Sequence, residues 1–113
     1  MKTIWTQEID AILAKGIWLG NIGVNNWALS RETAVTVLGE LRKIGVTVLG
    51  GDVYASTGKT LGPTRDSWYF EPNSMSCEET TLEASISKSK NYINNYHSST
   101  KEVYFALIPE CAD

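Results

Sequence analysis

The chain has 113 residues, of which 42% are hydrophobic and 20% are charged; these proportions indicate a globular protein with one domain over residues 1–113 and exclude a disordered chain. Thirteen acidic and ten basic residues give a net charge of −3, which argues against a nucleic-acid binder, because such a protein needs a basic surface to displace counterions from phosphates. No apolar run is long enough to span a membrane, and Glu8 and Asp10 interrupt any leader peptide, so we expect a cytoplasmic protein without membrane contact.

Two helices and an uncharged segment are predicted in the first half of the chain. Apolar residues between positions 5 and 13 have the spacing of one helix face, with Thr3 or Thr6 as the N-cap. Residues 16–30 contain no charge and three glycines, which predicts a packed loop with one short extended piece. A second helix follows its capping residue Ser30.

Three strands and a long third helix are predicted in the second half. Turn residues between positions 55 and 66 predict a long loop that joins the first two strands. Ser76 and Glu79 have the spacing of a capping box at the start of the helix. The strands are rich in β-branched and aromatic residues. Their ranges are 46–54, 68–70 and 103–108.

The element order ααββαβ predicts an α+β fold. We expect a small mixed sheet of three to four strands covered by about three helices, with the fourth strand drawn from residues 17–29. The third helix is long enough to act as a crossover, which predicts that the third strand runs parallel to the second.

Gly50, Gly51 and Asp52 interrupt an otherwise apolar strand. Glycines weaken a strand, so either another group approaches this backbone closely or the strand bulges there. If the strand is buried, the Asp52 carboxylate accepts backbone or tryptophan N–H bonds and fixes the bulge. This structural role predicts that Asp52→Asn lowers the melting temperature. The alternative is that Asp52 acts as a general base or contacts a partner.

Motifs for metals and nucleotides fail on spacing. Ser56–Thr60 ends like a phosphate-binding loop, but Val53 stands where the first glycine of that motif belongs. One histidine, His97, and two distant cysteines, Cys77 and Cys111, do not make a zinc site. We therefore expect no metal, no cofactor, free thiols and no catalytic activity.

The acidic excess lies in the second half of the chain, where residues 57–113 hold eight acids and five bases. Five carboxylates occur between positions 66 and 83 without any lysine or arginine. They form either a solvated surface or a docking surface for a basic partner, with Trp68 and Tyr69 as aromatic anchors. Only one of these two neighbours can enter the core of a sheet covered on one side. The carboxylates are Asp66, Glu71, Glu78, Glu79 and Glu83.

Two segments resemble one known family. The first is Val48–Tyr54, with the sequence VLGGDVY, and the second is Leu61–Tyr69, with Pro63, Asp66 and Trp68 at matching positions. Both resemble immunity protein family forty of bacterial polymorphic toxin systems. The similarity covers roughly residues 20–108 and leaves the first helix unmatched. It implies a small α+β protein without catalysis that binds and blocks the toxin domain of its own contact-dependent or secreted toxin system.

We therefore predict an immunity protein that neutralises a cognate toxin by covering a basic toxin surface. The first alternative is a ligand-binding domain or enzyme built on Asp52 and Asp66, with Lys59 and Arg65. The second alternative is a plain structural subunit. Nothing in the sequence indicates an oligomeric state. The candidate toxin contacts are Asp66, Trp68, Tyr69, Glu71, Glu78, Glu79 and Glu83, followed by the uncharged segment Ile17–Leu29 with Trp18 and Trp27.

Overall fold

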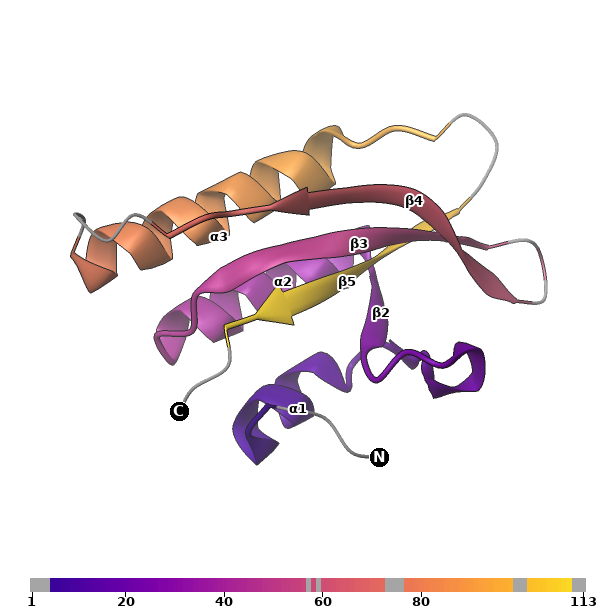
Figure 1. Cartoon of the computed structure of the whole chain (residues 1–113), viewed down its shortest axis with the longest axis horizontal. Coiled ribbons are helices and arrows are strands. Elements are labelled where there is room, and N and C mark those ends of the chain that lie inside the picture. Colours follow the sequence, from indigo (N-terminus) through magenta and orange to yellow (C-terminus); the bar gives the residue numbers. More distant parts are fainter. Residues whose placement is uncertain (1–4, 57, 59, 73–76, 99–101, 111–113) are drawn as a thin grey trace.

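A computed structural model of the chain describes residues 5–56, 58, 60–72, 77–98 and 102–110. They form an α+β fold with a five-stranded sheet in the order β1-β2-β5-β3-β4 (Figure 1). Within the described ranges, no helix is both long and apolar enough to cross a membrane. The helices are α1 (Gln7–Leu13), α2 (Arg31–Lys43) and α3 (Glu78–Asn95). The strands are β1 (Ile17–Trp18), β2 (Trp27–Ser30), β3 (Val48–Ser56), β4 (Leu61–Tyr69) and β5 (Val103–Pro109), and the 3-10 turn η1 (Gly20–Ile22) follows β1.

The predicted α+β class is confirmed, but the predicted mixed sheet is wrong, because every neighbouring pair of strands is antiparallel. Strands β4 and β5 do run in the same direction, as the crossover argument requires. However, β3 lies between them and pairs antiparallel with both. The uncharged segment supplies two strands where one was predicted, because β1 and β2 pair with each other across η1.

The hairpin of β3 and β4 is longer than predicted. Strand β3 extends to Ser56 and β4 begins at Leu61, so the predicted loop over residues 55–66 is wrong. Pro63 is tolerated within β4 because β4 is an edge strand, where a missing N–H on the outer side breaks no ladder bond. A register shift between Asp52 and Tyr54 of β3 marks a bulge in this hairpin.

Side-chain caps fix the starts of the helices. The hydroxyls of Thr6 and Ser30 accept backbone N–H bonds at the starts of α1 and α2, so both predicted caps are confirmed. Helix α3 instead begins after Cys77, whose sulfur accepts a bond from the N–H of Thr80. The predicted capping residue Ser76 lies outside the described residues.

All three helices pack on one face of the sheet. In Figure 1, β3 and β5 pass in front of α2, which lies behind them. Alternate residues of β5, Phe105 and Leu107, enter the main core with Leu13 of α1, Leu38 of α2 and Ile93 of α3. The residues between them face the opposite side, which we call the open face. There Tyr54, Ala106 and Leu19 form a second, smaller cluster with Ala28 and Tyr104.

The indole ring of Trp68 packs against the backbone of Gly51. These two residues lie opposite each other in the hairpin, and a Cβ on Gly51 would lie only 2.4 Å from the ring and 2.7 Å from the Ala106 carbonyl oxygen. The indole N–H donates to the Ser89 hydroxyl at 2.9 Å, which ties β4 to α3. Gly50 has φ +149° beside a register shift in β3. The predicted close approach and the predicted bulge are therefore both present.

We predict that Gly51→Ala lowers the free energy of unfolding by about 1–3 kcal/mol, because the new methyl group displaces Trp68 from a filled core. The matched control is Gly39→Ala in α2, where a Cβ meets nothing within 4 Å. This control should raise the free energy of unfolding by about 0.5–1 kcal/mol, as alanine does in a helix interior. Urea denaturation measures both. Equal stability of Gly51→Ala and the parent would contradict the packing argument.

Candidate functional site

The carboxylates of the predicted acidic surface do not lie together. Asp66 in β4 accepts a hydrogen bond of 2.6 Å from the Tyr96 hydroxyl at the end of α3, and this bond raises the pKa of Tyr96. Glu78 and Glu79 lie in the first turn of α3. A helix of 18 residues is about 27 Å long, so Asp66 and the two glutamates are at opposite ends of α3.

The fold also brings basic groups to this acidic segment from elsewhere in the chain. Glu83 forms an ion pair with Arg42 of α2. The ammonium group of Lys88 donates to the backbone oxygen of Tyr69 at 2.5 Å. Within the described ranges, only Glu71, Glu78 and Glu79 of the five carboxylates have neither an ion-pair partner nor a hydrogen-bonding tyrosine. All three side chains are exposed.

Trp68 and Tyr69 point in opposite directions, as the strand alternation predicted. Trp68 is only 6% exposed and stacks on Tyr92, with the ring centroids 4.6 Å apart. It stabilises the core, so it is not available as an aromatic anchor for a partner. Tyr69 is 69% exposed and lies on the open face. Tyr69 therefore remains a candidate aromatic anchor for a partner, whereas Trp68 does not.

The expectation that Asp52 is buried is wrong. Asp52 pairs with Ser67 of β4 and Ala106 of β5 and is exposed on the open face. The described residues donate no hydrogen bond to its carboxylate. Partial desolvation by its neighbours raises the pKa of Asp52. Burial raises the pKa of Tyr54, and the nearby charge of Asp52 raises it further.

A pocket of about 270 Å³ lies at one end of the open face, between the segment β1–η1 and the β3–β4 hairpin. Apolar side chains from three separate parts of the chain line it. Two of the lining residues, Ile17 and Ile22, are large hydrophobic residues that are exposed to solvent. Tyr69 and Ile108 are also large, hydrophobic and exposed. The lining includes Ile17, Trp18, Leu19, Ile22, Leu61 and Tyr104.

The two tryptophans of the uncharged segment are not surface anchors. Trp27 is buried and Trp18 is half-buried, and their ring centroids are 4.8 Å apart. Both contact the main core. The apolar side chains that this segment presents to solvent are those of Ile17 and Ile22 instead.

Among the residues that the structure describes, Asp52, Asp66 and Arg65 of the alternative enzyme form no acid–base pair. Asp52 lies on the open face, whereas Asp66 contacts Tyr96 on the helix-covered side. Arg65 is exposed at φ +75° in β4, and Lys59 lies outside the described residues. His97 is exposed just beyond α3. The described part of the chain contains no cluster of three side chains that could hold a metal ion.

Cys77 lies at the start of α3. Cys77 is a free, exposed thiol, and its hydrogen bonds with Thr80 lower the pKa of the thiol. Cys111 lies outside the described residues. The arrangement as a whole therefore suits binding, because the row next to Asp52 holds the exposed side chains of Tyr69 and Ile108.

Comparison with known proteins gives one match. Residues 18–109 match the family model described as immunity protein 40. This range contains strands β2 to β5 and α3, and it leaves α1 and Ile17 outside. Neither a curated protein nor a solved structure matches the chain.

We predict that Asp52→Asn raises the melting temperature slightly at pH 7, opposite to the effect expected for a buried hydrogen-bonding carboxylate. The folded protein holds the pKa of Asp52 above its ordinary value of 3.8, so ionised Asp52 destabilises the folded state. This penalty is present above the folded pKa and disappears as the pH falls below the ordinary value. Thermal unfolding of both proteins at pH 7 and pH 3 should show a difference only at pH 7. A lower melting temperature for the variant at pH 7 would contradict this prediction and support a structural role for the Asp52 carboxylate.

Proposed function

The chain belongs to the immunity protein 40 family, and we propose that it neutralises a cognate bacterial toxin domain by binding it. The family match over residues 18–109 is the observation that supports this proposal most directly. The geometry agrees with it, because the described residues offer exposed aromatic, aliphatic and acidic groups but no paired catalytic groups. Neutralisation then results from occlusion of the toxin surface, without chemistry by the immunity protein.

The toxin surface that fits this chain is basic. The chain has a net charge of −3, and Glu71, Glu78 and Glu79 keep exposed carboxylates that no described cation neutralises. A toxin that cleaves nucleic acid needs a basic surface to bind its substrate. An acidic inhibitor is attracted to that surface over distances of about a Debye length, which accelerates capture. The proposed setting is the cytoplasm of a bacterium with a contact-dependent or polymorphic toxin system.

The test is co-expression with the toxin domain encoded next to this chain. Cells that make the toxin domain alone should stop growing, and cells that also make this chain should grow. The two purified proteins should form a complex of fixed stoichiometry on size-exclusion chromatography. Growth rescue without a complex would contradict neutralisation by binding. Absence of both would contradict the proposed function as a whole.

We predict that the double variant Glu78→Lys/Glu79→Lys associates several-fold more slowly with the toxin domain at low salt and has a flatter salt dependence. The reason is that exposed charges at an interface rim act mainly on the association rate. Glu83 is left unchanged because a lysine there would face Arg42. Stopped-flow binding at two salt concentrations measures the rates.

The control is Glu8→Lys/Glu32→Lys, which alters the net charge equally but places the new charges on α1 and α2. It should slow association less. If both double variants associate at the parental rate, the attraction between the proteins does not depend on these carboxylates. Circular dichroism verifies that each variant folds.

A further inference from the structure

The open face is the side of the sheet on which no described helix packs. The helices pack on the other face, and only the segment around η1 reaches over one end of this one. Four of the five large hydrophobic side chains that are exposed in the described structure belong to this side: Ile17, Ile22, Tyr69 and Ile108. Tyr69 and Ile108 lie in one row of this side, and Ile17 and Ile22 line the pocket at its other end.

The register of the strands places these groups in rows. One row holds Ile108 of β5, Gly50 of β3 and Tyr69 of β4. Two residues along β3, the next row on this face holds Ala106, Asp52 and Ser67. The row after that pairs Tyr54 with Tyr104 and leads to the pocket. Because Gly50, Ala106 and Ser67 are small, the face is shallow around Asp52 and is bordered by larger side chains.

The paired positions of this face carry charge of one sign. Asp52 is the charged residue in the three paired rows, and the Tyr104 hydroxyl donates to a second carboxylate, that of Glu102, at 2.9 Å. None of these paired positions holds lysine, arginine or histidine. A second copy of the chain is a poor occupant, since a symmetric contact would bring two acidic faces together. A basic surface with apolar groups around it is the complementary occupant.

We propose that the toxin covers the open face, with a lysine or arginine of the toxin bound to Asp52 and the rings of Tyr69 and Tyr104 beside it. This inference rests on the proposed function and names the contact surface for it. Tyrosine and aliphatic groups around a desolvated ion pair are typical of the residues that dominate binding energy. The exposed glutamates of α3 then act on the approach of the toxin, whereas the open face holds the complex together.

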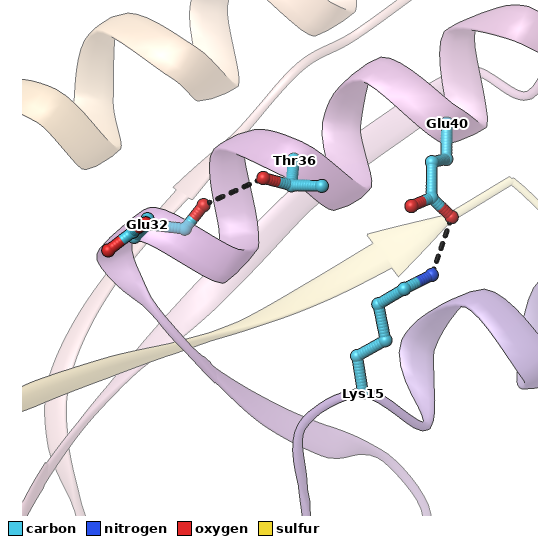
Figure 2. Close-up of polar contacts among 4 residues, drawn as sticks. All are labelled: Lys15, Glu32, Thr36 and Glu40. Carbon is cyan, nitrogen blue, oxygen red and sulfur yellow. Dashed lines mark hydrogen bonds and ion pairs between the residues drawn. The ribbon is translucent and has the colours of Figure 1, made fainter.

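The experiment measures dissociation of the toxin domain encoded next to this chain from four single variants. Asp52→Lys and Tyr69→Ala should each accelerate dissociation by about tenfold or more, as loss of a central contact does. Glu32→Lys is the matched control for Asp52→Lys, and Ile44→Ala is the control for truncation of an exposed hydrophobic side chain; both residues lie outside the open face. Glu32 lies on α2 away from the Lys15–Glu40 ion pair (Figure 2), and Ile44, at the end of α2, is 37% exposed, like Ile108. Both controls should dissociate within about twofold of the parental rate.

Each outcome is informative. If the parental chain does not bind the toxin domain, the proposed function fails. If the parental chain binds and the open-face variants dissociate at the parental rate, the function stands and the contact surface is overturned. Self-association of the parental chain that Asp52→Lys abolishes would instead assign this face to a second copy and also overturn the proposal.

A folded state is verified for every variant by circular dichroism. If Asp52→Lys does not fold, Asp52→Asn and Ile108→Ala replace it, since both remove a group without adding one. They should accelerate dissociation several-fold while the melting temperature stays near the parental value. Parental dissociation rates for both replacements would overturn the proposal.

Discussion

The packing of the Trp68 indole against the Gly51 backbone determines how the rest of the sheet is arranged. The ring fills the space that a side chain at position 51 would need, and Ser89 of α3 holds the indole N–H. Edge strand β4 is thereby fastened to both β3 and α3. Once Trp68 points inward, strand alternation directs Tyr69 outward, and Asp52 turns away from the core for the same reason. A core contact thus creates the exposed surface on the other side.

This one-sided arrangement separates structural from recognition roles. On the helix-covered side, several polar side chains bond to other residues of the same chain. Asp66 accepts a hydrogen bond from Tyr96, and Glu83 forms an ion pair with Arg42. The open face keeps the Asp52 carboxylate without a partner among the described residues. In the proposed complex, the toxin contacts these acidic and apolar groups as the sheet already presents them. A rigid, preformed surface loses little conformational entropy on binding.

Long-range contacts also explain why carboxylates that are close in the sequence are separated in the fold. Along the sequence, five carboxylates follow one another without a base and suggest one surface. In space, Glu78, Glu79 and Glu83 lie in the first two turns of α3, whereas Asp66 contacts Tyr96 at the other end of this helix. Arg42, which pairs with Glu83, comes from a different helix. Charge density in the sequence is therefore a poor measure of charge density on the surface. The acidic groups that remain available are Glu71, Glu78 and Glu79, together with Asp52 on the open face.

Sequence patterns were enough to predict the α+β class, the capping residue Ser30, a first cap at Thr3 or Thr6, the alternation of Trp68 and Tyr69, and the need for a close contact or bulge at the paired glycines. These features depend on neighbours within a few residues, which local patterns record. Only the tertiary structure decided the strand order, the burial of each face and the partners of the acidic residues. The apolar run of β5 concealed that its alternate residues face different clusters. Asp52 was misjudged for the same reason: whether a strand is covered on one face or two depends on where distant helices pack, and no local spacing encodes that.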